Sequence, residues 1–161
     1  MAINVGDKVP AATFMHKTAD GIEPVTTEDY FAGKKVVLFS VPGAFTPTCS
    51  AKHLPGFVQN AAALKAKGVD SIACISVNDA FVMDAWGKDQ QVGDKVDMLA
   101  DGSAKFAQAM GLELDLTERG LGVRGKRYAM VVEDGVVKDL FVEPTPGDFE
   151  VSSAEYVLGK L

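Results

Sequence analysis

"KKVVLFSVPGAFTPTCS", residues 34–50, joins two contrasting patterns in one short stretch of the chain. Residues 34–41 form a continuous apolar run rich in valine, which is typical of a strand that is covered on both faces. Residues 42–48 contain two prolines, a glycine and two threonines, so we expect a stiff loop after the strand. Cys49 comes next, where a helical pattern begins. The stretch therefore predicts a central strand, a loop, and a helix with a cysteine in its first turn.

Shorter patterns on both sides predict an alternation of strands and helices. We expect strands at 12–16, 69–77 and 96–100, helices at 25–33, 50–68 (with a kink at Pro55), 79–90, 103–111 and 152–161, and a β-hairpin at 126–143 that turns at Asp134-Gly135. This order predicts an α/β fold with a thioredoxin-like layout, in which a central mixed sheet is flanked by helices and followed by a C-terminal β-hairpin and helix. Because no repeat or linker-like stretch interrupts it, we expect residues 1–161 to form a single domain.

The composition narrows the class of protein. The chain has 161 residues, of which 47% are hydrophobic and 24% charged, as in an ordinary globular domain. No apolar run reaches the ~18 residues of a spanning helix, and the N-terminus lacks the basic start and apolar stretch of a signal peptide. The net charge of −6 argues against a nucleic-acid partner. The basic residues at 124–127 are too few for such a surface.

The two cysteines, Cys49 and Cys74, form no CxxC pair. With His16 and His53 they give no spacing of zinc ligands, so we expect no metal site and no framework of disulfides. This cysteine usage is typical of a thiol-reducing compartment, and we expect a cytoplasmic protein.

Cys49 lies where ligands bind in open α/β sheets, at the carboxyl end of a strand. The start of a helix offers unpaired N–H groups and a partial positive charge, which favour a thiolate over a thiol. We therefore expect Cys49 to be a nucleophile. A buried, inert cysteine is the commoner fate of this residue type, but the Pro/Gly loop before Cys49 favours reactivity.

Thr46 precedes Cys49 by three residues, so its hydroxyl can face the sulfur and donate a hydrogen bond to it or to a substrate oxygen. Alternatively, Thr46 or Thr48 only caps the helix. A cap accounts for one threonine and leaves the cysteine unexplained.

The spacing Pro42-x3-Thr46-x2-Cys49 matches the PxxxTxxC signature of the peroxiredoxins of the AhpC/TSA superfamily. The stretch at 41–57 resembles the type II (Prx5-like) group, and the resemblance continues at 68–86, 100–135 and 151–158, over nearly the entire chain. It implies a thioredoxin-fold peroxidase that reduces hydrogen peroxide and organic hydroperoxides. Cys49 would attack the peroxide and become a sulfenic acid, with no cofactor, because the sulfur supplies the electrons.

The resemblance also assigns the neighbours of Cys49. The active-site arginine of the family is mapped to Arg124, with Arg127 as its competitor. A guanidinium there would serve sulfur and peroxide together, Thr46 would contact the proximal oxygen, and Pro42 would shield the sulfenic acid from water. His53 shares the helix face of Cys49 and is expected to tune the thiolate or to be structural. Aromatic side chains that would line the mouth of the pocket, or pack in the core, are Phe45, Trp86 and Phe81.

A sulfenic acid must meet a second thiol, and Cys74 is the other cysteine of the chain. It lies in a predicted buried strand, so pairing would require the helix of Cys49 to unwind, and we expect Cys74 to be dispensable. Animal members of the type II group carry a resolving cysteine near the C-terminus, where this chain has serines at 152 and 153. Plant and many bacterial relatives share the present arrangement. The resemblance therefore implies regeneration by glutathione with glutaredoxin, or by thioredoxin through a Cys49–Cys74 disulfide, and it suggests a homodimer that covers Phe45 and Leu116.

Two other classes of protein could be built around a reactive Cys49. A general thiol–disulfide oxidoreductase would need a second cysteine close to Cys49, where Ser50, Ala51 and Lys52 follow. A peroxide sensor or redox-regulated chaperone would use the same reactive cysteine and differs by stopping after one equivalent of peroxide.

Overall fold

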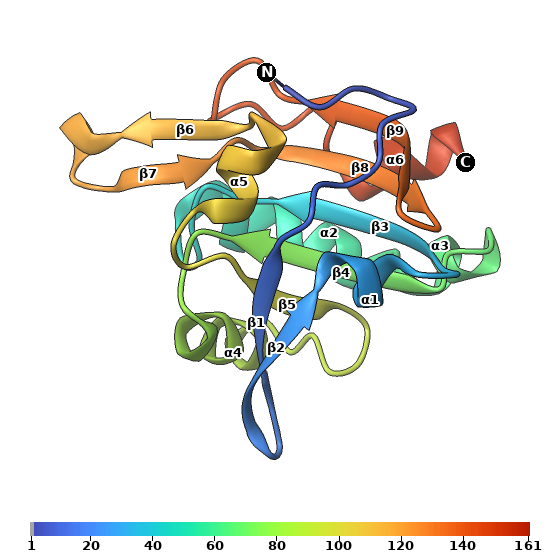
Figure 1. Cartoon of the computed structure of the whole chain (residues 1–161), viewed down its shortest axis with the longest axis horizontal. Coiled ribbons are helices and arrows are strands. Elements are labelled where there is room, and N and C mark those ends of the chain that lie inside the picture. The colour runs from blue at the N-terminus through green and yellow to red at the C-terminus, as the bar shows by residue number, and fades with distance from the viewer. Residues whose placement is uncertain (1) are drawn as a thin grey trace.

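The computed structural model describes residues 2–161 and confirms the predicted α/β fold (Figure 1). A seven-stranded mixed sheet has the order β2-β1-β5-β4-β3-β8-β9, and β6 and β7 form a separate pair. The strands are β1 (Thr13–Thr18), β2 (Gly21–Thr26), β3 (Lys35–Ser40), β4 (Ser71–Ser76), β5 (Asp97–Ala100), β6 (Glu113–Leu116), β7 (Gly122–Gly125), β8 (Tyr128–Glu133) and β9 (Val136–Val142). The helical segments are α1 (Thr27–Phe31), η1 (Cys49–His53), α2 (Leu54–Gln59), α3 (Ala61–Ala66), α4 (Ala80–Asp89), α5 (Lys105–Met110), η2 (Thr117–Arg119) and α6 (Ala154–Lys160).

The sheet is central because both of its faces are apolar. On β3, Val36 and Leu38 pack with α1 and α5 on one face, and Val37 and Phe39 pack with α2, α3, α4 and α6 on the other. In Figure 1, α1, α5 and the N-terminal segment lie in front of β3, and α2 and α3 lie behind it. The continuous apolar run in β3 is therefore needed to bury both faces.

The pairing of β3 determines where the site lies. It runs parallel to β4 and antiparallel to β8, with Ser40 opposite Tyr128. Because β8 is antiparallel, its first residues lie beside the end of β3, where the loop to Cys49 begins. This end of the β3–β8 pairing therefore brings residues 40–49 close to the residues just before β8.

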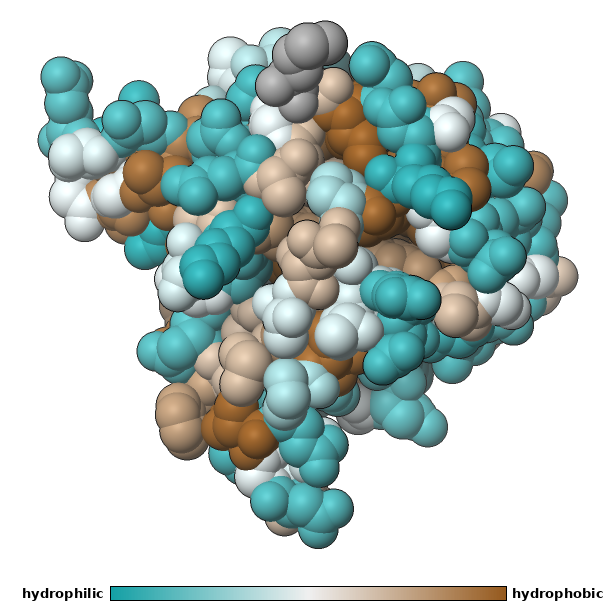
Figure 2. Space-filling model, in the orientation of Figure 1, coloured by the Kyte–Doolittle hydropathy of each residue, from teal (hydrophilic) through white to brown (hydrophobic). Residues whose placement is uncertain are grey.

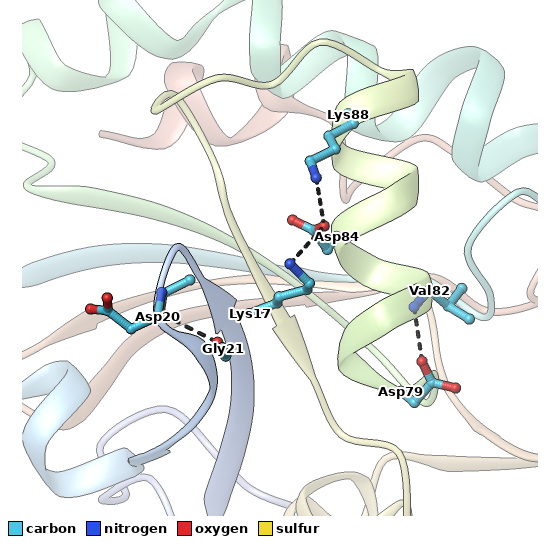
Figure 3. A network of polar contacts seen from close by, with 8 residues as sticks. Lys17, Asp20, Gly21, Asp79, Val82, Asp84 and Lys88 are labelled. Atoms are coloured by element: carbon cyan, nitrogen blue, oxygen red, sulfur yellow. Dashed lines mark hydrogen bonds and ion pairs between the residues drawn. The ribbon is translucent and has the colours of Figure 1, made fainter.

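Several helix ends carry residues that commonly cap helices. Thr26, Asp79 and Ser153 each accept a backbone N–H as the N-cap of α1, α4 and α6. Helix α5 ends at Gly111, whose φ is 69°. On α4, Asp84 forms an ion pair with Lys88 of the same helix at 3.1 Å and one with Lys17 at 3.7 Å, and the latter ties the helix to β1 (Figure 3).

Two features differ from the sequence-based predictions. The segment at 50–68 was expected to be one helix, but it is a π-helical turn over Cys49–His53 followed by α2 and α3, with a break at Asn60. Pro55, where a kink was expected, stands in the first turn of α2, just after the π-helical turn. Strands β2, β6 and β7 were not predicted. Strand β6 alternates polar and apolar residues over only four positions, the shortest run that can indicate a strand.

Candidate active site

Cys49 lies at the third position of the helix that follows β3, and its side chain is fully buried. Residues 47 and 48 open the helix, with Pro47 at the first position, where no N–H is needed. Within the π-helical turn, the N–H of Leu54 donates to the carbonyl of Cys49. The structure therefore confirms the predicted placement of a cysteine in the first helical turn after the central strand.

The arginine that contacts the sulfur is Arg127. Its Nη2 donates to Cys49 Sγ at 3.2 Å, and its side chain is only 3% exposed. Arg127 directly precedes β8, so the antiparallel pairing with β3 brings it to the end of the strand that leads to Cys49.

The mapping of the active-site arginine to Arg124 was wrong, because the sulfur is contacted by Arg127, whereas Arg124 lies on β7 of the small separate sheet and bonds to backbone carbonyls. Its Nε donates to the Leu121 carbonyl at 2.8 Å, and its Nη1 reaches the carbonyls of Pro42 at 3.4 Å and Val77 at 3.3 Å. A Cβ on Gly43 would lie 3.0 Å from that Nη1, so only glycine lets the guanidinium approach the loop without a shift. Arg124 thus holds the loop before Cys49, whereas Arg127 contacts the sulfur.

His53 orients Arg127. Nη1 of Arg127 lies 2.8 Å from His53 Nδ1, and His53 Nε2 lies 2.9 Å from the Ser152 carbonyl oxygen. Because the guanidinium only donates and the carbonyl only accepts, the imidazole must be neutral with its proton on Nε2. Burial, and then the positive charge of Arg127, lowers the pKa of His53 to about 3. His53 therefore acts on the site through Arg127.

The other predicted residues surround Cys49 at different depths. Pro42 is buried, and the Thr46 hydroxyl donates to the Gly43 carbonyl at 2.6 Å. Donation from Thr46 to the sulfur or to a substrate oxygen was expected. Because its proton is used by the Gly43 carbonyl, the Thr46 hydroxyl has lone pairs left with which it can accept a hydrogen bond. Phe45 is 54% exposed and has a φ of 63°, a conformation that costs energy for a bulky residue.

Two aromatic residues expected at the pocket mouth lie apart from each other. Trp86 is fully buried, and its Nε1 donates to Ser50 Oγ at 3.0 Å, so it anchors the helix of Cys49 to α4. Phe81 is 65% exposed and lines a separate cavity of about 600 Å³ beside β1 and β2.

Cys74 lies on β4 opposite Phe39 of β3, fully buried, and forms no disulfide with Cys49. Burial, and then the nearby Cys49, raises the pKa of the Cys74 thiol well above its ordinary value. A thiol in this state is a weak nucleophile.

Within residues 2–161, no group of three or more His, Cys, Asp or Glu side chains is arranged to hold a metal ion. In the same range, no helix is both long and apolar enough to cross a membrane.

Because the pKa of His53 is lowered on folding, the unfolded chain binds a proton at higher pH than the folded chain. We therefore expect this residue to make the folded state less stable as the pH falls from about 6.5 towards 3, by about 1.4 kcal/mol per pH unit. Urea unfolding of the protein and of His53→Gln between pH 4 and pH 7 measures the difference. Parallel stability curves for the two proteins would contradict the neutral imidazole.

Comparisons with known proteins bear on the family of this chain. The Redoxin family model matches residues 4–158. The chain is 52% identical to the chloroplastic peroxiredoxin-2E of Arabidopsis thaliana, over 99% of this chain and 70% of that protein, and 50% identical to peroxiredoxin-2B of the same plant, over 99% and 98%. The crystal structure of reduced Prx3 from Vibrio vulnificus in complex with hydrogen peroxide superposes with a TM-score of 0.94 at 53% identity, covering 98% of each chain. With Cys49 in the PxxxTxxC position and relatives of this similarity over its whole length, the chain belongs to the peroxiredoxins.

Proposed function

We propose that this protein reduces hydrogen peroxide and organic hydroperoxides through Cys49, and that an external thiol returns the cysteine to its reduced state. Its peroxiredoxin relatives support thiol peroxidase activity. The observation that carries the proposal is the bond from Arg127 Nη2 to Cys49 Sγ at 3.2 Å, within a buried site that excludes bulk water.

The reaction needs a thiolate and a polarised O–O bond. A sulfur lone pair attacks one peroxide oxygen, the S–O bond forms as the O–O bond breaks, and the departing oxygen takes a proton and leaves as water or alcohol. The sulfur is oxidised by two electrons to a sulfenic acid, and the peroxide is reduced by two. Because the sulfur supplies both electrons, we propose no cofactor.

Arg127 is well suited to this step. A guanidinium has five N–H groups, and three of its bonds are made to Cys49, His53 and the Pro146 carbonyl. The remaining N–H groups can stabilise the negative charge that develops on the peroxide oxygens. Thr46 can accept the O–H of a hydroperoxide, and the buried Pro42 can keep water from the sulfenic acid.

Replacing Arg127 should slow the reaction of Cys49 with hydrogen peroxide. We expect Arg127→Lys to lower the second-order rate constant about 10²- to 10³-fold, because a lysine keeps the charge and loses the planar fork. Stopped-flow fluorescence of Trp86, whose indole is bonded to Ser50 next to Cys49, measures the rate. Arg124→Lys should have a smaller effect, through the loop alone.

The exposed Arg119 provides a matched arginine control, and Arg119→Lys should react at the unmodified rate. Equal losses in the Arg127 and Arg124 variants would contradict the assignment of Arg127.

We further propose that glutathione attacks the Cys49 sulfenic acid and that glutaredoxin removes the resulting mixed disulfide. The raised pKa of the buried Cys74 supports this route over an internal disulfide. Thioredoxin acting through a Cys49–Cys74 disulfide is the alternative. Either route requires a thiol-reducing compartment, and the cytoplasm is the one we propose.

Mass spectrometry after peroxide treatment distinguishes the two routes. We expect the glutathione adduct to appear on Cys49 equally in the unmodified protein and in Cys74→Ser, because Cys74 takes no part. Cys49→Ser should form no adduct and show no turnover with glutathione and glutaredoxin. An internal disulfide in most of the unmodified sample would overturn this route.

A homodimer is the remaining proposal. Phe45 and Phe81 are exposed large apolar side chains, and Met15 and Ile22 join Phe81 at the cavity between α4 and the β1–β2 hairpin. Apolar atoms gather at the lower left of Figure 2, over this part of the molecule. Such a patch is typical of a protein interface. Sedimentation equilibrium should give a dimer that Phe81→Glu dissociates, and a monomer at micromolar concentration would contradict the proposal.

A further inference from the structure

Glu143 is a buried carboxylate beside Arg127. It follows β9 directly, and its backbone N–H donates to the Arg127 carbonyl at 3.0 Å, which extends the β8–β9 ladder beyond the pair Tyr128 and Val142. Its side chain is 4% exposed. A carboxylate is rarely buried to this degree, because it loses its hydration. Hydrogen bonds inside the protein must compensate for that loss.

Those bonds close a loop. Glu143 Oε2 accepts the backbone N–H groups of Glu150 and Ser152, both at 2.8 Å, and the Ser152 hydroxyl at 2.6 Å. Oε1 is buried and has no hydrogen-bond partner within residues 2–161. A single carboxylate oxygen thus joins the beginning and end of residues 143–152, which we call the clasp loop. Three hydrogen bonds converge on this one oxygen, so the closure depends on where that oxygen lies.

The clasp loop supplies the groups that orient Arg127 and His53. The Pro146 carbonyl accepts Arg127 Nε at 3.1 Å, and the Ser152 carbonyl lies 2.9 Å from His53 Nε2. Phe149 of the same loop packs against the His53 ring, with ring centroids 5.1 Å apart. The guanidinium and imidazole are therefore both held by a segment that Glu143 closes.

We propose that Glu143 is a positioning residue for the chemistry at Cys49: by closing the clasp loop it fixes the two carbonyls that aim Arg127 at the sulfur. The effect on catalysis rests on the proposed peroxidase function, whereas the effect on Arg127 and His53 does not. What Glu143 contributes is an acceptor at one point in space, and its charge is secondary.

Three substitutions separate these contributions. Glu143→Gln keeps a side-chain oxygen at the length needed to accept the three bonds, and places its amide nitrogen where Oε1 has no partner. Glu143→Asp keeps the charge but is one carbon too short to reach the same donors. Glu143→Ala removes both the acceptor oxygen and the charge. Glu113→Ala, at an exposed glutamate of β6, is the matched control.

The first readout is NMR of the folded, reduced protein, which requires no turnover. We expect the Arg127 Nε–H signal to exchange slowly with water, and His53 to carry its proton on Nε2, in the unmodified protein, Glu143→Gln and Glu113→Ala. In Glu143→Asp and Glu143→Ala, the Arg127 signal should exchange at least about tenfold faster, and His53 should sample both tautomers. If Glu143→Ala does not fold, the contrast between Gln and Asp decides the question.

The second readout is the rate of Cys49 with hydrogen peroxide. We expect Glu143→Ala and Glu143→Asp to lower it about ten- to hundredfold and Glu143→Gln to retain most of it. In an Arg127→Lys background the further loss should be small, because the effect passes through Arg127. A loss of the same factor in both backgrounds would show a general structural effect and overturn the proposal.

The outcomes remain distinguishable from a failure of the proposed function. If the unmodified protein does not react with peroxide, the proposed peroxidase function fails. The NMR comparison still tests whether Glu143 positions Arg127 and His53 through the clasp loop. Unchanged Arg127 and His53 signals in both Glu143→Asp and Glu143→Ala would overturn the positioning role. If Glu143→Asp retained the Arg127 and His53 signals and Glu143→Gln lost them, the positioning role would be overturned too, since charge would then be the determining property.

Discussion

One guanidinium held against one buried sulfur is the contact on which the rest of the site depends. Arg127 and Cys49 are both removed from water, so each needs partners of suitable charge and geometry. Arg127 donates to the sulfur, to the neutral His53 and to the Pro146 carbonyl. These three hydrogen bonds restrict the orientation of the guanidinium plane. A fixed donor pays no reorganisation cost when charge develops in the reaction, which is why such placement favours catalysis.

The fold produces this contact through strand pairing. The parallel run of β3 beside β4 sends the chain into a helix with Cys49 in its first turn, and the antiparallel β8 returns Arg127 to the same edge of the sheet. Residues 143–152 then supply the Pro146 carbonyl that accepts Arg127 Nε. The nucleophile, its cationic partner and its outer support therefore come from three separate parts of the sequence that meet at one end of β3.

Much of this arrangement could be predicted from the sequence. The two-sided apolar pattern of residues 34–41 predicts β3, and the Pro/Gly/Thr loop with a helical pattern behind it predicts the place of Cys49. The arginine was mapped to Arg124 on the register of the family resemblance, with Arg127 as its competitor, and the sequence did not show that Arg124 belongs to a separate pair of strands. The predicted hairpin at 126–143 did place Arg127 next to a strand, but the pairing of that strand with β3 is a long-range contact that only the structure shows.

Other features depend on long-range contacts that a sequence pattern does not carry. The proton on His53 Nε2 follows from Arg127 on one side and Ser152 on the other, 74 and 99 residues away. The π-helical turn at Cys49–His53 replaces the expected α-helical start, and the Thr46 proton is used by the Gly43 carbonyl. These details arise from packing and from the satisfaction of buried polar groups, which local propensity does not determine.

In the proposed reaction, Arg127 stabilises charge on the peroxide oxygens and does more than make Cys49 a reactive thiol. The most direct measurement compares the rates of Cys49 with hydrogen peroxide and with iodoacetamide, each relative to the thiolate of free cysteine. We expect the peroxide reaction to be faster than that of free cysteine by about 10³-fold or more, and the alkylation to stay within about tenfold of it. Equal enhancement of both reactions would contradict the claim, because it would reduce the site to a reactive thiol without selectivity for peroxide.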